Sequence, residues 1–540
     1  MNPWGNIWPA TRMESHYGDR VVRCFAERPP SVYAMLLAAV ARNPDGAALV
    51  CGEERITYSQ LLEQSTRLAA GLAARGIRAG DRVALLLGNR NAFVITLFAA
   101  LRIGAIAVPI SIREQPPGLA YMLAHCAAAL VVHEADLGAL LPFAVDVPAL
   151  RTRVSIGPCA GSEQFTTLLV DGAIPDIAQV DEEDTVAILY TSGTTGKPKG
   201  AMLTHLGIVH SSLHYQIAMG LSQTDSSIAA VPLSHVTGLV ALITTMVLAA
   251  AKLTIMPAFK AAEFLRLAAR ERMTHTLMVP AMYNLCLLQS DFDAHDISNW
   301  RIGAYGGAPM PAAAIKTLAA KVPSLTLMNC YGSTETTSPA TLMPPGQTAA
   351  HSDTVGTQLG CVEMRVMSDG GCELPHDHLG EIWIKGPMVV RGYWDNPAAT
   401  KENLTAGFWH SGDIGSIDAE DYVKVVDRKK DMINRGGYKI YTIEVENTLY
   451  ANPAVQECAV VSKPCAVLGE RVHAFVMLKQ AGMTADMLAE FCSSRLSDYK
   501  VPESFTLSLT ALPRNANGKL VKRELREQLL AGLRATQGVS

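Results

Sequence analysis

Several features that mark particular classes of protein are missing from the sequence. Positive charge is not in excess, because 46 Lys and Arg residues stand against 50 Asp and Glu residues, and the formal net charge is −4. This balance gives no general attraction to nucleic acids or anionic membranes, so no nucleic-acid partner is expected. The eleven cysteines are scattered without a pair spaced by two residues. They indicate reduced thiols in a cytoplasmic protein, not a zinc site or a disulfide framework.

Long hydrophobic runs are missing as well. The longest apolar run, residues 238–251, is too short to span a bilayer and is typical of a buried helix. The first twenty residues contain no apolar segment of the length that a signal peptide needs. We therefore expect neither a secretion signal nor a membrane span.

The order of the predicted elements indicates an α/β protein with more than one domain. The 540 residues exceed the length of about 250–300 at which a single core stops growing. Between residues 31 and 307, amphipathic helical patterns alternate with short apolar strands, which predicts parallel-type sheets covered by helices. Strands with alternating faces at 380–386 and 422–428 predict a smaller β-rich subdomain. The remaining residues, roughly 100 in number, predict a compact α+β unit.

A loop rich in Gly, Ser, Thr and Lys follows the apolar strand 185–190. Its sequence, YTSGTTGKPKGAM at 190–202, is typical of phosphate binding, because Gly backbone amides and hydroxyls can surround phosphate oxygens. It is not a Walker A loop, because only two residues separate Gly193 from Gly196, and Pro198 replaces the usual Ser or Thr. Pro198 also prevents a helix from starting directly after the loop. A mobile surface loop is the alternative interpretation.

Further motifs follow the phosphate loop in a fixed order. They are GGAP (306–309), YGSTE (331–335), HSGDIG (410–415), DRKKD (427–431), NRGGYKI (434–440) and PRNANGKLVKREL (513–525). Taken singly, several have a plain structural explanation, such as a turn aspartate or a helix cap. Together, and in this order, the motifs resemble the adenylate-forming superfamily, which contains acyl- and aryl-CoA synthetases, peptide-synthetase adenylation domains and beetle luciferases. The sequence is most similar to a freestanding acyl-CoA synthetase over about residues 31–530.

The resemblance implies a two-step reaction and a division into domains. ATP, with Mg²⁺, activates a carboxylic acid as an acyl-adenylate, and coenzyme A then takes the acyl group, so that pyrophosphate and AMP are released. The expected boundaries are an N-terminal extension at 1–30, an AMP-binding N-terminal domain at 31–427, a hinge at 428–431 and a mobile C-terminal domain at 432–540. A translation start at Met13 stays open.

The resemblance also assigns roles to individual residues. Lys519 bridges the substrate carboxylate and the α-phosphate, Glu335 and Thr195 bind Mg²⁺, Asp413 accepts the ribose hydroxyls, and His235 shields the carboxylate until CoA arrives. These roles suit a phosphoryl-type transfer, which depends on positioning and charge neutralisation. Further contacts to the nucleotide or to CoA are expected from Thr191, Ser192, Gly193, Thr194, Gly196, Lys199, Gly306, Gly307, Ala308, Pro309, Tyr331, Gly332, Thr334, Arg428, Gly436 and Gly437.

The second step depends on a hinge and on an acyl acceptor. The resemblance implies that Lys430 is the hinge, and that rotation there would withdraw Lys519 and bring Gly436 and Gly437 close to the pantetheine. The chain ends about twenty residues after Lys519, which leaves no room for a carrier domain. The acceptor is therefore a separate molecule, with CoA as the default, and transfer to a separate carrier protein, a luciferase-like oxygenase and a non-catalytic nucleotide-binding relative are the alternatives. A homodimer stays open.

The resemblance implies that three segments line the acyl pocket. They are residues 235–239, 304–308 and 331–340, whose side chains are mostly small, apolar or hydroxylic. The acid is therefore expected to have a neutral tail, which can be short-to-medium aliphatic, alicyclic or aromatic. A malonate-like acid is disfavoured because these segments lack Arg, whereas a carnitine-like cation stays open because Tyr305 or Tyr331 could face it. The residues after His235 also disfavour an amino acid as the substrate.

Overall fold

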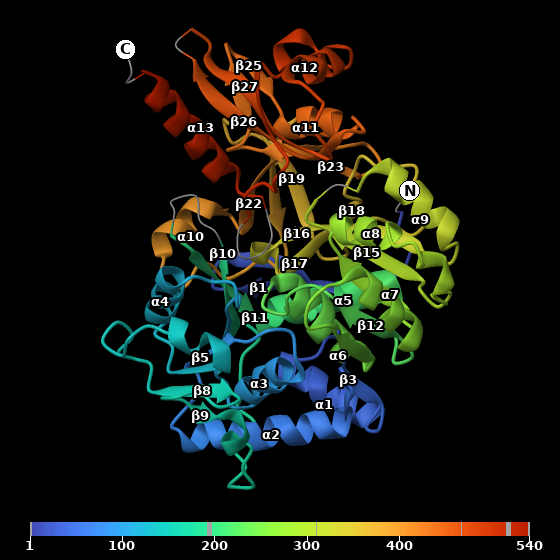
Figure 1. Ribbon diagram of the computed structural model, residues 1–540. Helices are drawn as coiled ribbons and strands as arrows, with labels where there is room; N and C mark the ends of the chain where they lie inside the picture. Colours follow the sequence, from blue (N-terminus) through green and yellow to red (C-terminus); the bar gives the residue numbers. More distant parts are fainter. Residues whose placement is uncertain (1–2, 192–196, 309, 466, 515–519, 538–540) are drawn as a thin grey trace. The chain divides into compact units, whose positions relative to one another are not determined.

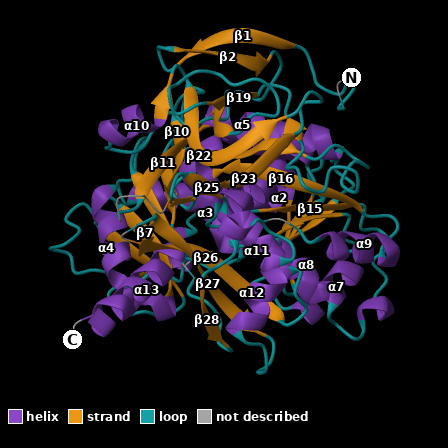
Figure 2. Ribbon diagram, turned by 90° about the horizontal axis from the view of Figure 1, so that it is seen from above, coloured by secondary structure: helices purple, strands orange, loops and turns teal. Residues whose placement is uncertain are grey.

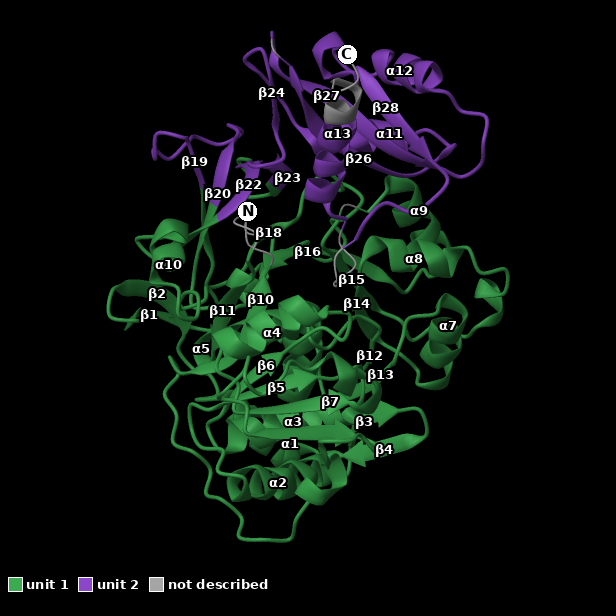
Figure 3. Ribbon diagram, turned by 60° about the vertical axis from the view of Figure 1, so that its left-hand side comes forward, with its two compact units in different colours: residues 1–365, 383–410, 418–423 green, residues 366–382, 411–417, 424–540 purple. Residues whose placement is uncertain are grey.

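The computed structural model describes residues 3–191, 197–308, 310–465, 467–514 and 520–537 (Figure 1). The chain divides into two compact units (Figure 3). Unit 1 comprises residues 1–365, 383–410 and 418–423, and unit 2 comprises residues 366–382, 411–417 and 424–540. Among the described residues, none of the helices is long and apolar enough to cross a membrane.

The first large sheet of unit 1 has seven strands in the order β11-β10-β6-β5-β7-β8-β9. All neighbouring pairs are parallel except β10–β11, which is an antiparallel hairpin. The strands are β5 (Arg82–Leu86), β6 (Ile106–Pro109), β7 (Leu130–Glu134), β8 (Thr152–Ile156), β9 (Glu163–Gln164), β10 (Thr185–Thr191) and β11 (Lys199–Thr204). Helix α2 (Tyr58–Ala74) precedes β5, and α3 (Asn91–Arg102) and α4 (Pro116–His125) connect β5 to β6 and β6 to β7.

The second large sheet of unit 1 has nine strands in the order β18-β17-β16-β15-β14-β12-β13-β3-β4, and its central pairs are parallel. Its strands are β3 (Ala47–Cys51), β4 (Glu54–Thr57), β12 (Ser226–Ala229), β13 (Lys252–Ile255), β14 (His275–Met278), β15 (Ile302–Gly306), β16 (Thr326–Ser333), β17 (Ser338–Leu342) and β18 (Thr357–Gln358). The predicted parallel-type sheets are confirmed.

Helices cover both large sheets. Beside α2 to α4 they are α1 (Val32–Arg42), α5 (His205–Met219), α6 (Thr245–Ala249), α7 (Ala261–Arg270), α8 (Pro280–Leu287) and α9 (Ala312–Lys321). The longest apolar run is helical and buried, as predicted, and it divides into a π-helix, η3 (Thr237–Thr244), and α6. Because helices bury the faces of a parallel sheet, its strands are almost continuously apolar, as in β7, where Leu130, Val131 and Val132 have no exposed surface.

The N-terminal segment is folded against unit 1. It forms an antiparallel hairpin, β1 (Thr11–His16) and β2 (Arg20–Phe25), at the periphery of that unit (Figure 2). Ahead of the hairpin, the indole of Trp4 is buried, and its Nε1 donates a hydrogen bond to Thr357 Oγ1 at 2.8 Å. A start at Met13 would omit Trp4 and the first two residues of β1.

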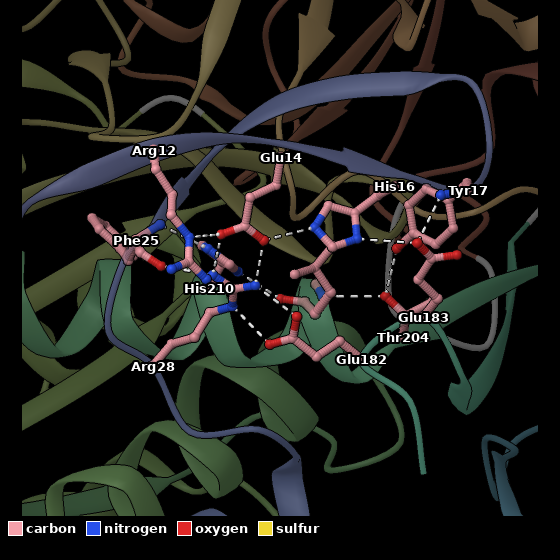
Figure 4. A network of polar contacts seen from close by, with 12 residues as sticks. Arg12, Glu14, His16, Tyr17, Phe25, Arg28, Glu182, Glu183, Thr204 and His210 are labelled. Carbon is pink, nitrogen blue, oxygen red and sulfur yellow. Dashed lines mark hydrogen bonds and ion pairs between the residues drawn. The ribbon is translucent and has the colours of Figure 1, made fainter.

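A buried ion-pair network holds this hairpin (Figure 4). Arg28, whose side chain is 6% exposed, forms bidentate contacts with Glu14 of β1 and with Glu182, which precedes β10. A fifth hydrogen bond goes to the carbonyl of Phe25 at 2.7 Å, so every N–H of the guanidinium is used. The imidazole of His16 lies between Glu14 and Glu183. The network therefore joins the hairpin to the strand that leads to the phosphate loop.

A third sheet confirms the predicted β-rich subdomain. Its order is β19-β20-β22-β21, and β23 pairs with β22. Its elements are β19 (Glu363–Met367), β20 (Gly380–Lys385), α10 (Pro397–Asn403), β21 (Leu404–Thr405), β22 (Phe408–Ile417) and β23 (Val423–Arg428). The residues of this sheet are divided between the two units.

The C-terminal part of unit 2 has the predicted α+β composition. Its sheet has the order β25-β24-β27-β26, with β28 beside β27. Its elements are β24 (Ile433–Arg435), β25 (Tyr438–Ile440), α11 (Thr442–Tyr450), β26 (Val455–Cys465), β27 (Gly469–Leu478), α12 (Ala485–Ser493), β28 (Ser504–Ser508) and α13 (Lys522–Gln537). Residues such as Ile433, Val445 and Val476 form a separate hydrophobic core.

Candidate active site

A buried carboxylate forms the centre of the site in unit 1. Glu335 lies in a single 3₁₀ turn, η5 (Thr334–Thr336), which directly follows β16, and it is 7% exposed. Its Oε1 accepts hydrogen bonds from Thr191 Oγ1 and from the hydroxyl of Tyr393, both at 3.1 Å. Its Oε2 accepts one from Ser333 Oγ at 2.6 Å. Three hydroxyls thus fix the orientation of this carboxylate.

The surroundings of Glu335 fit a magnesium ion. Within the described part of the chain, no Lys, Arg or His forms an ion pair with this buried carboxylate, and a buried charge is costly without a cation. The nearby donors are carboxylate and hydroxyl oxygens, which are the hard ligands that Mg²⁺ prefers. Glu335 would hold the ion, with Thr191 beside it. Thr195, the other predicted ligand, lies outside the described residues.

The phosphate loop connects the two strands of the β10–β11 hairpin. Thr191 pairs with Lys199 across the end of this hairpin. The chain continues as strand β11 from Lys199, so the prediction that no helix follows directly is confirmed. The hydroxyl of Tyr121 in α4 donates to the Pro198 carbonyl at 3.2 Å, and Lys197 Nζ lies 5.8 Å from the centre of the Tyr121 ring.

The two predicted adenine segments are neighbours in unit 1. Strands β15 and β16 are parallel, and Gly306 pairs with Cys330, so the segments that follow leave the same edge of the sheet, where ligands bind in such sheets. Gly306 has no room for a side chain, because a Cβ would lie 2.4 Å from the Cys330 carbonyl oxygen. Gly307 has a φ of +79°, which favours glycine. The structure therefore brings Gly306 and Gly307 of the GGAP segment close to Tyr331.

The predicted acyl segments contain a further set of contacts. His235 Nδ1 accepts a hydrogen bond from the backbone N–H of Thr237 at 3.3 Å, and it lies 3.1 Å from Thr237 Oγ1. The π-helix η3 follows, a form that is frequent at functional sites. The buried hydroxyl of Tyr215 in α5 pairs with Ser338 Oγ at 2.7 Å. Sequence reasoning did not identify Tyr215.

The predicted ribose-binding acid lies in unit 2. Asp413, in β22, is 4% exposed, and its Oδ1 accepts from Arg428 Nε at 2.7 Å. The hydroxyl of Ser411 accepts the backbone N–H of Asp413 at 3.0 Å. Within this unit the structure therefore brings together two residues that the sequence predicted separately, Asp413 and Arg428.

The predicted hinge and CoA-side residues also lie in unit 2. Lys430 is exposed in the turn between β23 and β24. Burial alone would lower the pKa of the adjacent Lys429, but the carboxylates of Asp369 and Glu381 outweigh it and raise the pKa. Gly436 and Gly437 form the β24–β25 turn with φ values of +60° and +94°.

Other site predictions fall where the structure gives no description. The residues outside the described part are Ser192, Gly193, Thr194, Thr195, Gly196, Pro309 and Lys519. Of the predicted residues that are described, Ala308 follows the Gly306–Gly307 turn, Gly332 lies in β16, and Thr334 begins η5. A Cβ on Gly332 would lie 2.1 Å from the Ser338 carbonyl oxygen, so this glycine permits close packing of β16 on β17.

Comparison with known proteins identifies the family. The model of the AMP-binding enzyme family matches residues 36–394, and that of the AMP-binding enzyme C-terminal domain matches residues 444–519. Feruloyl-CoA synthase from an Amycolatopsis species is 34% identical over 487 residues, which cover 90% of this chain and 96% of the relative. The long-chain-fatty-acid–CoA ligase FadD13 of Mycobacterium tuberculosis is 32% identical over 88% of this chain and 94% of the relative.

A solved structure shows the same fold with a reaction intermediate bound. The anthranilate CoA ligase AuaEII in complex with anthranoyl-AMP has a TM-score of 0.86 and 25% sequence identity, over 93% of this chain and 98% of that chain. The fold and the phosphate loop beside a buried, hydroxyl-bound carboxylate define an adenylate-forming enzyme. The chain belongs to the AMP-binding enzyme family. It is an AMP-forming acid–thiol ligase, which uses ATP and Mg²⁺ to activate a carboxylic acid and passes the acyl group to CoA.

Proposed function

We propose that the carboxylic acid activated by this ligase has an uncharged, aromatic tail. The expected acyl segments, residues 235–239, 304–308 and 331–340, contain one fixed charge, Glu335, which the three hydroxyls bind. A second carboxylate or an ammonium group on the substrate would therefore be buried without a dedicated partner, which is costly. This lack of a spare charge carries the proposal. The buried ring of Tyr305 and the similarity to a feruloyl-CoA synthase and an anthranilate CoA ligase support the aromatic tail.

In the proposed first step, a carboxylate oxygen of the acid attacks the α-phosphorus of ATP, and the bond to the bridging oxygen breaks. Pyrophosphate leaves, and the acyl-adenylate remains. Lys519 stabilises the charge shared by the carboxylate and the α-phosphate, while Tyr331 stacks on adenine and Asp413 accepts the ribose hydroxyls. When bound to Glu335 and Thr195, Mg²⁺ supplies charge neutralisation on the phosphates.

In the proposed second step, the sulfur of CoA attacks the acyl carbon, the thiol proton is lost, and AMP leaves with the bonding electrons. Lys430 is the pivot about which the C-terminal domain, residues 432–540, turns between the steps. Gly436 and Gly437 then present backbone without side chains to the pantetheine. The positive φ values of both glycines fit a tight turn that no other residue adopts as readily.

A panel of acids tests the proposed substrate. AMP release is measured with and without CoA for benzoic, 4-hydroxycinnamic, hexanoic, hexadecanoic and malonic acids and for carnitine, at equal concentrations. We expect kcat/KM to be highest for one of the two aromatic acids and lowest for malonic acid and carnitine. One methylene changes substrate preference by only about 1–3 kcal/mol. The kcat/KM of the preferred acid must therefore exceed that of the other classes of acid by at least about tenfold. A clear preference for hexanoic acid, hexadecanoic acid, malonic acid or carnitine would show that the proposal is wrong.

We also propose a cytoplasmic location and a homodimer. All eleven cysteines are free; seven of them are buried, three are partly buried and only Cys372 is exposed, which suits a reducing compartment. Fractionation of the source cells checks the location.

Sedimentation equilibrium checks the oligomeric state, and a mass of 57.8 kDa at all concentrations would contradict the homodimer.

A further inference from the structure

A short segment outside the predicted motifs links the phosphate loop to Glu335. The segment comprises residues 390–394. The backbone N–H of Val390 donates a hydrogen bond to the Glu335 carbonyl at 2.9 Å. The Gly392 carbonyl accepts a hydrogen bond from the backbone N–H of Met202 at 3.0 Å. The backbone N–H of Trp394 donates one to the Gly200 carbonyl at 2.7 Å. The segment is thus hydrogen-bonded both to the turn that carries Glu335 and to strand β11, and the backbone of Tyr393 is held between these contacts.

The side chain of Tyr393 reaches both sides of the site. It is 5% exposed, and its hydroxyl donates to Glu335 Oε1. The ammonium of Lys199 lies 5.3 Å from the centre of its ring, a cation–π distance. The side chain of Tyr393 therefore contacts both Glu335 and Lys199.

The hydrogen bonds of Glu335 are unequal. Each carboxylate oxygen can accept about two hydrogen bonds. From the described residues, Oε1 accepts two, from Thr191 and Tyr393, whereas Oε2 accepts one, from Ser333. The remaining acceptor position is therefore on Oε2. The hydroxyl of Tyr393 provides the second hydrogen bond to Oε1 and thereby restricts rotation of the carboxylate.

We propose that Tyr393 is a positioning residue, which presents Oε2 of Glu335 to Mg²⁺ and holds the ammonium group of Lys199 against its ring. The inference rests on the proposed role of Glu335 as the metal ligand. Partners that orient a ligating carboxylate change metal affinity by about 10–100-fold when they are lost. Because Tyr393 itself does not touch the metal, its loss is expected to weaken Mg²⁺ binding without abolishing it.

The test measures equilibrium binding of ATP to the full chain by isothermal titration over a range of Mg²⁺ concentrations, without acid or CoA. We expect Y393F to raise the half-saturating Mg²⁺ concentration by roughly tenfold. The matched control is Y58F, which also removes a buried hydroxyl, whose hydrogen bonds go to the carbonyls of Met246 and Ala251. We expect Y58F to lower the melting temperature and to leave the Mg²⁺ dependence unchanged.

Two further variants separate the parts of the proposal. E335Q tests the metal site itself, and if it leaves the Mg²⁺ dependence unchanged, the proposed role of Glu335 is wrong. If E335Q changes this dependence and Y393F does not, the inference about Tyr393 alone is wrong. Y393L also removes the ring beside Lys199, so we expect it to weaken ATP binding even without Mg²⁺. Equal binding of ATP by Y393L and Y393F in the absence of Mg²⁺ would overturn the part that concerns Lys199.

Discussion

Replacement of Arg28 by methionine would remove the guanidinium that joins the N-terminal hairpin to the rest of unit 1. Methionine keeps much of the side-chain length and the apolar contacts, so the change acts mainly on the charge. Glu14 and Glu182, whose side chains are 16% and 27% exposed, would lose their bidentate partner. They would then face each other as partly buried carboxylates that still require solvation.

The partial burial of these side chains sets the size of the expected free-energy loss. Breaking a fully buried ion pair costs about 3–5 kcal/mol, and an exposed pair is worth about 0–1 kcal/mol. The Arg28 pairs lie between these limits but close to the buried one, so we expect a loss of about 2–3 kcal/mol in the free energy that keeps the hairpin closed. This loss corresponds to an increase of about 30- to 160-fold in local opening.

Hydrogen–deuterium exchange of the backbone amides of β1 and β2 measures this opening directly. R12M is the matched control, because Arg12 binds the same carboxylate of Glu14 but its side chain is 62% exposed. We expect R12M to change the exchange by less than about fivefold. If R28M exchanged no faster than R12M, the reasoning that this network holds the hairpin would be refuted.

The same network predicts a dependence on pH. The Arg28 hydrogen bonds, with help from Arg12 and against the effect of burial, hold the pKa of Glu14 well below its ordinary range. A carboxylate with a depressed pKa in the folded state stabilises the protein above its unfolded pKa of about 4.3, and this stability is lost as the pH falls below that value. We therefore expect opening of the hairpin to increase below about pH 4.3 in the wild type and to depend less on pH in R28M.

Three further predictions concern the reaction. K519A should abolish adenylate formation and spare thioester formation from pre-made acyl-adenylate, and equal loss of both half-reactions in rapid-quench assays would argue against the role of Lys519. K430P should slow the second half-reaction mainly, because proline stiffens the pivot, and normal overall turnover would remove the hinge assignment. G306A should weaken ATP binding at least tenfold, because its Cβ would lie 2.4 Å from the Cys330 carbonyl oxygen; titration with ATP checks this, and wild-type affinity would contradict the tight fit.

The order of the motifs was sufficient to predict the class of fold and the main nucleotide-site candidates. The alternation of strands and helices follows from periodicity, and the absence of a helix directly after the phosphate loop follows from Pro198, because both are local effects. The ion pair between Asp413 and Arg428 joins two motifs whose proximity was expected only from the family resemblance.

Tyr393 and the N-terminal network could not be predicted in this way. Tyr393 lies far from Glu335 in the sequence, and no motif around Tyr393 predicts a contact with Glu335. Arg28 binds Glu14 and Glu182 from two separate segments, a contact that only the tertiary fold creates. The 1–30 segment was expected as an extension, and its packing through Trp4 depends on Thr357, which is equally remote.

The central claim is that acid activation and thioester formation are successive steps that consume ATP to give AMP. The most direct measurement follows ATP–pyrophosphate exchange with an accepted aromatic acid, and then quantifies AMP and acyl-CoA after CoA is added. The account predicts acid-dependent exchange without CoA, followed by AMP and acyl-CoA in equal amounts. Release of ADP and phosphate, or exchange that never leads to acyl-CoA, would contradict it.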